Sequence, residues 1–148
     1  SYNLSEQLCE SLLQFESVWE EKEMEISTDI PEDITISADS ELLSIVWNNL
    51  LSNAFKFTDM GGKVSVSLSE DSEYATVTVS DTGCGMTAET GKHIFEKFYQ
   101  GDTSHATKGN GLGLALVKRI IDITGGEVSV TSAVGVGSTF KIKVPKNT

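Results

Sequence analysis

Two stretches in which apolar and polar residues alternate most restrict the folds open to this chain of 148 residues. In residues 63–80, apolar side chains at Val64, Val66 and Leu68 alternate with polar ones, and the alternation resumes after a polar turn. Residues 128–144 repeat the pattern around a glycine-rich turn. Alternation of this kind is typical of strands with one buried face, so we predict two β-hairpins.

Three helices are predicted around these hairpins. Residues 5–20 carry apolar side chains at spacings of three and four, with glutamates on the opposite face. A second helix begins at an N-cap, Asp39 or Ser40, and reaches about Phe57. A third covers about residues 111–124 and ends at a pair of glycines.

Shorter segments complete the expected order, with extended pieces near residues 23–29 and 34–38 and a short helix near 92–98. The strands come as antiparallel pairs rather than alternating singly with helices, which favours an α+β fold. We therefore predict a two-layer α/β sandwich, with three main helices packed on one face of a mixed, largely antiparallel sheet. The length is that of one domain, covering residues 1–148.

The net charge of −11 is concentrated near the N-terminus. Residues 1–40 hold 11 acidic side chains and a single base, Lys22, whereas the rest of the chain is nearly balanced. We interpret residues 1–38 as an acidic segment made of a helix and short strands. The sequence has no basic stripe that could follow a phosphodiester backbone, so no nucleic-acid partner is expected.

The sequence shows neither a membrane span nor a targeting segment. No stretch approaches the ~18 apolar residues that span a bilayer, and a basic-then-apolar signal pattern is missing. Cys9 and Cys84 follow no metal-ligand spacing, which favours a reducing compartment. We expect a soluble, monomeric, cytoplasmic domain, which a membrane segment elsewhere in a longer protein could anchor.

The second predicted helix carries a polar row among apolar residues. Asn49, Asn53 and Lys56 stand at i, i+4 and i+7 and therefore share one face. Burying amides and an ammonium group is costly unless they find partners. A ligand with phosphates and Mg²⁺ would supply such partners, and a solvated polar face is the alternative.

Two glycine-rich segments could also contact a ligand. Residues 81–86, DTGCGM, follow a strand, and the carboxylate of Asp81 could accept a hydrogen bond from the amino group of adenine. Residues 109–114, GNGLGL, open a helix whose N-terminus favours an anion. Their spacing is neither a P-loop nor a Rossmann fingerprint. A turn with an Asx hydrogen bond and a flexible hinge are the respective alternatives.

Two phenylalanines and a polar stretch lie between these segments. Phe95 and Phe98 are three residues apart and could pin a short helix to the core. Residues 100–108 are polar and small, a composition typical of a mobile lid. Taken alone, the phenylalanines indicate only packing.

In this order and spacing, the motifs resemble the N, G1, F and G2 boxes of the catalytic domains of histidine kinases. These domains belong to an ATP-binding superfamily shared with type II topoisomerases, Hsp90 and MutL. The resemblance reaches from the NLSEQL segment near the N-terminus to GVGSTF at residues 135–140, so it covers nearly the whole chain.

The resemblance implies a set of site residues. It makes Asn49, Asn53 and Lys56 catalytic, with Asn53 coordinating Mg²⁺, Asn49 supporting the metal or a phosphate, and Lys56 contacting phosphates. Asp81 would bind the adenine amino group, and Phe57 would stack near the base. The other nucleotide-binding residues that it implies are Gly83, Gly85, Met86, Phe98, Lys108, Gly109, Gly111, Leu112, Gly113 and Thr139.

The same resemblance makes residues 99–109 an ATP lid. One departure from the family pattern is Gln100, where arginine is frequent. This departure leaves open whether Lys97 or Lys108 completes the clamp on the γ-phosphate.

The implied activity is transfer of the γ-phosphoryl group of MgATP to a histidine in two-component signal transduction. Asn49 disfavours hydrolysis, because the topoisomerase and Hsp90 branches have a glutamate there and an amide cannot act as a general base. His93 and His105 lack the helical, acid-flanked setting of an acceptor. The implied partners are therefore a separate helical dimerisation and phospho-acceptor domain and, downstream, a response regulator.

Three other functions stay open at this point. The first is an ATPase-type conformational module like those of topoisomerases and Hsp90. The second is a non-catalytic nucleotide sensor, at which only Gln100 hints. The third is a serine kinase acting on regulator proteins, which typically keeps the glutamate.

Overall fold

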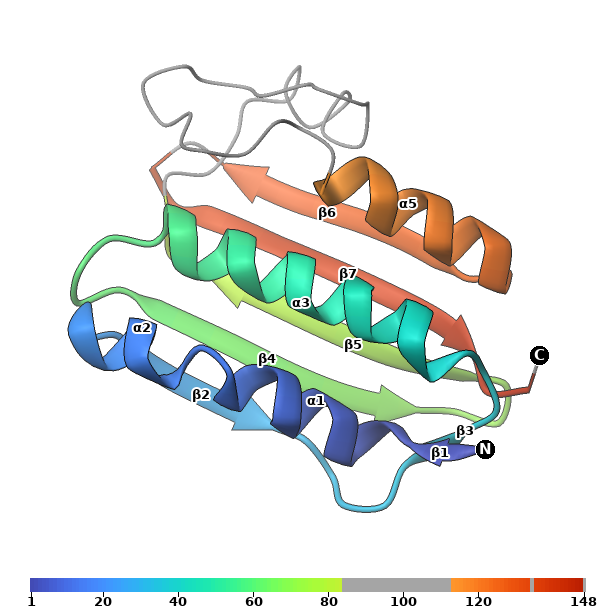
Figure 1. Cartoon of the computed structure of the whole chain (residues 1–148). Coiled ribbons are helices and arrows are strands. Elements are labelled where there is room, and N and C mark those ends of the chain that lie inside the picture. Colours follow the sequence, from blue (N-terminus) through green and yellow to red (C-terminus); the bar gives the residue numbers. More distant parts are fainter. Residues whose placement is uncertain (84–112, 134, 148) are drawn as a thin grey trace.

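The computed structural model describes residues 1–83, 113–133 and 135–147. Within these residues, helices form one layer and strands the other, as Figure 1 shows. The elements in chain order are β1 (Tyr2–Asn3), α1 (Leu4–Leu13), α2 (Glu16–Glu21), β2 (Glu25–Asp29), β3 (Thr35–Ile36), α3 (Ser40–Phe57), β4 (Lys63–Glu70), β5 (Tyr74–Asp81), α5 (Gly113–Thr124), β6 (Glu127–Ala133) and β7 (Gly137–Pro145). The short helix predicted near residues 92–98 lies outside the described residues.

The main sheet has five strands in the order β2-β4-β5-β7-β6. The pairs β4–β5 and β6–β7 are the two predicted hairpins, and β5 pairs antiparallel with β7 to join them. At one edge, β2 runs parallel to β4. A second, small sheet of β1 and β3 lies at the end of the molecule where both termini meet (Figure 1). The predicted α+β sandwich with a mixed, largely antiparallel sheet is confirmed.

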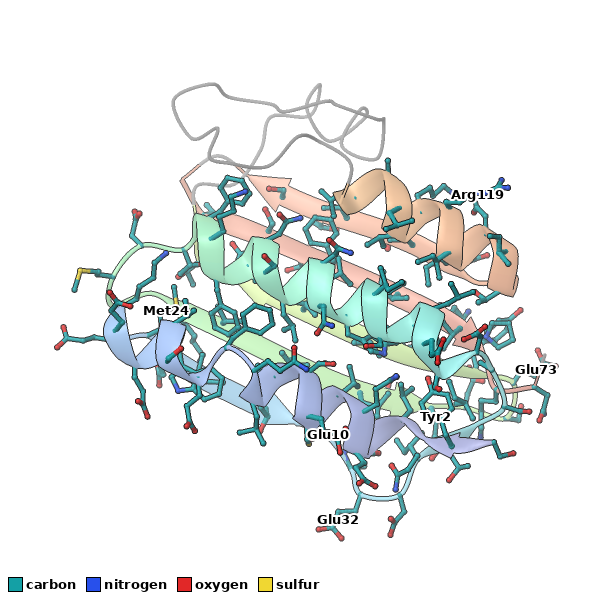
Figure 2. The ribbon with its side chains drawn as sticks, in the orientation of Figure 1. Tyr2, Glu10, Met24, Glu32, Glu73 and Arg119 are labelled. Carbon is teal, nitrogen blue, oxygen red and sulfur yellow. The ribbon has the colours of Figure 1, made fainter. Side chains whose placement is uncertain are left out.

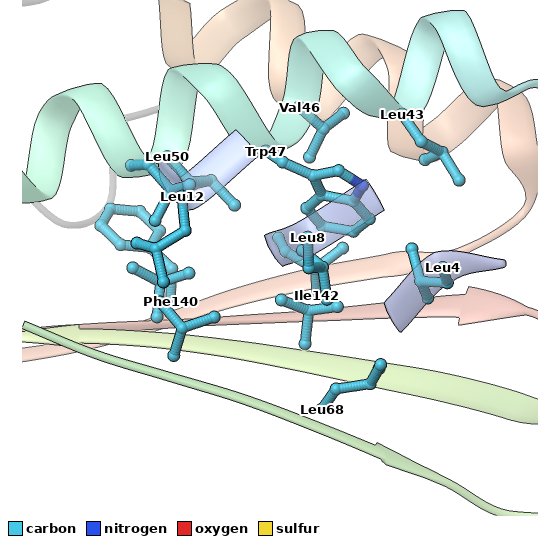
Figure 3. Packing of buried hydrophobic residues seen from close by; sticks show 14 of the residues in the cluster. Leu4, Leu8, Leu12, Leu43, Val46, Trp47, Leu50, Leu68, Phe140 and Ile142 are labelled. Atoms are coloured by element: carbon cyan, nitrogen blue, oxygen red, sulfur yellow. The ribbon is translucent and has the colours of Figure 1, made fainter. Parts of the chain in front are cut away.

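The hydrophobic core fills the space between the two layers. Every second residue of β5 is buried, and β4 and β7 alternate in the same way, with these side chains facing the helices. Figure 3 shows Leu8 of α1, Trp47 of α3 and Ile142 of β7, which all belong to the buried cluster between the layers. Full burial of a large apolar side chain contributes about 1.5–3 kcal/mol, so this interface holds the two layers together.

The helix predicted for residues 5–20 is two helices, so that prediction is wrong in one respect. Phe15 lies between α1 and α2 and leaves the helical conformation, with φ −102° and ψ 9°. The break lets the rings of Phe15 and Trp19 both pack on Phe55 of α3, with centroids 5.3 and 5.9 Å away. Because Phe55 is distant in the chain, its contact with Phe15 cannot be read from the hydrophobic period of residues 5–20.

The helix predicted up to Phe57 is confirmed as α3. Asp39 is its N-cap, since one carboxylate oxygen accepts from the backbone N–H groups of Glu41 at 3.0 Å and Leu42 at 3.1 Å. The buried residues of α3 are Leu43, Val46, Trp47, Leu50, Leu51, Ala54 and Phe55. The helix predicted up to Thr124 is likewise confirmed as α5.

A glutamine joins three elements at the N-terminal end of α3. The Gln7 Oε1 accepts from the Trp47 indole at 2.8 Å and from the Tyr2 hydroxyl at 2.9 Å. Its Nε2 donates to the Ser40 carbonyl at 2.8 Å. The network gives the buried indole N–H of Trp47 an acceptor. Burial of the Tyr2 hydroxyl raises its pKa above the ordinary value.

The acidic side chains of the N-terminal segment lie on the surface. Figure 2 shows Glu10 and Glu32 directed away from the body of the fold, and both are exposed. Among the residues that the structure describes, no helix is both long enough and apolar enough to cross a membrane.

The N-cap of α3 gives a test of the fold. We expect Asp39→Ala to lower the free energy of unfolding by about 1 kcal/mol, because two backbone N–H groups lose their acceptor. Asp39→Asn should stay close to wild type, since its amide oxygen can still accept. Urea unfolding followed by circular dichroism measures both, and equal losses in the two variants would contradict the capping role.

Candidate functional site

The polar row of α3 faces away from the N-terminal helices. Phe55 points from α3 toward α2, where it meets Phe15 and Trp19. The period of 3.6 residues places the opposite flank of α3, which carries Asn53, on the side of α5. α3 and α5 lie side by side and run antiparallel (Figure 1), so the first turn of α5 lies beside the C-terminal half of α3.

The three predicted residues of this row share that flank, and each is half-buried. Asn49 donates from Nδ2 to the Ile45 carbonyl at 2.8 Å, which leaves its oxygen as the free group of the amide. No hydrogen bond within the described residues engages the amide of Asn53. The Lys56 ammonium lies 5.6 Å from the centre of the Phe57 ring. This flank thus presents amide oxygens and an ammonium group that make no hydrogen bond with the described residues.

Asn48, the neighbour of this row, belongs to a different surface. The helical period puts it on the same side of α3 as Phe55, seven residues further on, which packs on Phe15 and Trp19. Its buried Oδ1 has no hydrogen-bond partner among the described residues. It therefore does not join Asn49 and Asn53.

Asp81 ends β5 with a half-buried carboxylate. Burial raises its pKa above the ordinary value of 3.8, and the backbone N–H groups of Gly83 and Ser138, which donate to it, oppose this rise in part. The hydrogen bond from the Gly83 N–H is 2.9 Å long and makes an Asx turn, which is the alternative to ligand binding for this motif. The turn and a ligand role are compatible, because a carboxylate has further lone pairs that can accept.

Two glycines let backbones approach closely around Asp81. A Cβ atom at Gly83 would lie 2.4 Å from the Phe57 carbonyl oxygen, so this segment lies directly against the end of α3. A Cβ atom at Gly137 would lie 2.0 Å from the Asp81 carbonyl oxygen, and its φ of +134° also favours glycine. The end of β5 is therefore held between α3 and the start of β7.

The structure does not bring Thr139 to this group. Its hydroxyl lies 3.0 Å from that of Ser80, on the face of the sheet turned away from the helices. Ser138 is the residue paired with Asp81, and it shares a face with the buried Phe140. The sequence could have indicated this, since Ser138 is two residues before the apolar Phe140 and therefore lies on the same face of the strand.

The remaining predicted site residues divide in two. Phe57 is the half-buried last residue of α3, and Gly113 begins α5. The others lie outside the described residues, as does the predicted lid at 99–109; they are Gly85, Met86, Phe98, Lys108, Gly109, Gly111 and Leu112. His93, Lys97, Gln100, His105 and Cys84 also lie outside.

The described part of the site combines three chemical functions. Amide oxygens on α3 can hold a hard cation. Lys56, together with the N-terminal end of the α5 dipole, favours an anion. The carboxylate of Asp81 can accept a hydrogen bond from an amino group.

Comparisons with known proteins show the family of the chain. Residues 38–148 match the family model described as histidine kinase-, DNA gyrase B-, and HSP90-like ATPase. The chain is 35% identical over 140 residues to the adaptive-response sensory kinase SasA of Prochlorococcus marinus subsp. pastoris, a match that covers 93% of this chain and 38% of that kinase.

Two solved structures are similar throughout the chain. The catalytic domain of histidine kinase ThkA has a TM-score of 0.88 and 28% identity, with 99% of this chain and 97% of that chain covered. Full-length ShkA, solved in complex with AMPPNP, has a TM-score of 0.83 and 31% identity, with 97% of this chain and 30% of that chain covered. The chain therefore spans less than half of SasA and of full-length ShkA.

The raised pKa of Asp81 predicts how stability depends on pH. The folded protein binds a proton there at a pH where the unfolded chain does not, so the stability contribution of Asp81 is lost as the pH rises through the folded pKa. Asp81→Asn removes this dependence. In urea unfolding, we expect the stability of wild type relative to Asp81→Asn to increase from about pH 7 to about pH 4.5.

Asp71 provides a control of opposite sign. The backbone N–H groups of Glu73 and Tyr74 donate to its carboxylate, each at 2.8 Å, and lower its pKa. Its contribution is present above its ordinary pKa and is lost as the pH falls. Wild type should therefore lose stability relative to Asp71→Asn toward acid, and the same trend in both pairs would contradict the assignment.

Proposed function

The chain belongs to the family of histidine kinase-, DNA gyrase B- and HSP90-like ATPases, and from this premise we propose that it donates the γ-phosphoryl group of MgATP to a histidine of a separate helical domain. It is a catalytic, ATP-binding domain of the kind found in sensor histidine kinases of two-component signalling. What the proposal adds is the destination of the phosphoryl group, a protein side chain rather than water.

The side chain at position 49 favours transfer of the phosphoryl group to a protein over hydrolysis by water. Asn49 is an amide, its nitrogen donates to the Ile45 carbonyl, and it has no group that can take a proton from water. The hydrolysing branches of the superfamily have a glutamate at this place. Phosphoryl transfer requires positioning and charge neutralisation from the protein, and a neutral amide can contribute to positioning.

Asn53 is the residue that we assign to Mg²⁺. Its half-buried amide lacks a hydrogen-bond partner among the described residues, which fits an oxygen kept free for a cation. Mg²⁺ usually binds few protein oxygens together with phosphates and water, so a single amide ligand suits it. A Mg²⁺ ion held by Asn53 would supply positive charge that neutralises phosphate oxygens.

The nucleotide itself would lie between α3, α5 and the end of β5. Lys56 would contact phosphates, and the first turn of α5 would face them with its positive dipole end. Asp81 would accept from the adenine amino group, with Phe57 beside the base. The AMPPNP bound in ShkA supports a nucleotide role for this type of domain.

The acceptor and the partners follow from the size of the related proteins. Because the chain spans 38% of SasA, we propose that the acceptor histidine lies in a helical dimerisation domain outside this chain and that a response regulator acts downstream. We propose a cytoplasmic place for the domain, in keeping with that partnership. The extent of the domain over residues 1–148, with a lid at 99–109, stays a prediction.

The metal assignment predicts the behaviour of Asn53→Ala. Wild type should bind ADP more tightly with Mg²⁺ than without it, and the variant should lose this gain, about 10-fold or more in Kd. Calorimetric titration with and without Mg²⁺ measures it. Ser52→Ala, an exposed neighbour on the same helix, is the matched control. A variant that keeps the full Mg²⁺ effect would refute the role of Asn53.

The assignment of Asp81 predicts base selectivity. Asp81→Asn should bind ADP about 10-fold more weakly, because one acceptor oxygen becomes a donor opposite the adenine amino group. Binding of GDP should change far less, which separates base recognition from general damage to the site. An unchanged preference for ADP over GDP would exclude this role.

A further inference from the structure

Lys22, the single base among residues 1–40, is directed at the end of α3. Its half-buried ammonium donates to the Phe55 carbonyl at 2.8 Å and to the Thr58 carbonyl at 3.1 Å. These bonds join residues 33 and 36 positions apart in the chain. Lys22 is thus a cap on the last turn of α3 that comes from another element.

The end of α3 has a chemical need for such a cap. The last carbonyls of a helix have no partners within it, and the dipole is negative at this end. The Thr58 hydroxyl donates to the Ala54 carbonyl at 2.6 Å, and Lys22 takes up the Phe55 carbonyl. Lys56, the basic residue of this turn, lies near the Phe57 ring instead.

Lys22 is itself fixed by its surroundings. Its backbone N–H donates to the Val18 carbonyl at 3.0 Å, and its own carbonyl accepts from Gly61 at 2.9 Å. A further bond of 2.9 Å links Glu25 to the Gly62 carbonyl. The segment that follows α2 and the loop that follows α3 are therefore tied together by two main-chain bonds.

The capped turn is the one that carries the candidate site. Asn53 and Lys56 lie in the last turns of α3, and the Phe57 carbonyl is in close contact with Gly83. Gly83 in turn donates to Asp81 at 2.9 Å. A shift of the last turn would therefore change the separation between the phosphate side of the site and its base side.

We propose that Lys22 is a positioning residue for nucleotide binding, which acts by holding the last turn of α3 in register with Asp81. The inference rests on the proposed function, in that it takes this site to bind ADP and ATP. Lys22 does not itself touch the nucleotide. Its effect is on the geometry of the residues that do.

The test uses Lys22→Met, which removes the ammonium group and keeps an apolar side chain of similar length. Calorimetry with ADP and Mg²⁺, at a temperature where circular dichroism shows the variant fully folded, should give a Kd about 10-fold weaker than wild type. Lys22→Arg retains charge and donors and should recover most of the affinity. Lys118→Met, which removes an exposed lysine paired with Asp122, should bind as wild type does.

The outcomes separate this inference from the proposed function. If wild type itself fails to bind ADP, the proposed function fails. If wild type binds and folded Lys22→Met binds equally well, or Lys22→Arg is as weak as Lys22→Met, Lys22 has only a structural role and the inference is overturned. Should Lys22→Met not fold, Lys22→Gln replaces it under the same criterion, because its amide can reach only one carbonyl at a time.

Discussion

Burial of one face of α3 against the sheet is the interaction on which the rest of the structure depends. Leu43, Val46, Leu50 and Ala54 are almost completely inaccessible and belong to the core between the helices and the sheet, where α3 contacts β5. Several such side chains contribute about 1.5–3 kcal/mol each, which fixes both the position and the rotation of the helix. The flank that carries Asn53 is thereby directed toward α5, so the core decides where the site residues point.

The site combines polar groups whose burial the fold only partly compensates. Burial raises the pKa of Asp81 although two backbone N–H groups donate to it, and the amide of Asn53 has no partner among the described residues. Half-buried groups of this kind have a free-energy cost that a ligand can relieve by supplying partners. Glycines at 83 and 137 let the main chain next to Asp81 lie directly against the end of α3 and the start of β7.

The same arrangement explains why such a domain would work with a partner. Asn49 has an amide that can orient a ligand but cannot take a proton, so in the proposed function the nucleophile at the γ-phosphate comes from elsewhere. The chain spans only part of the length of the sensor kinases that it resembles, 38% of SasA and 30% of full-length ShkA. In the proposed function, the fold positions MgATP and the partner provides the acceptor.

The sequence by itself determined the elements whose signals are local. Alternation predicted the hairpins, and the period of α3 with its cap at Asp39 predicted the longest helix and the polar row. Only the tertiary structure decided the break at Phe15 and the reach of Lys22 to the end of α3. The physical reason is that propensity and periodicity act between neighbours, whereas these features depend on contacts between distant segments that exist only once the layers have packed.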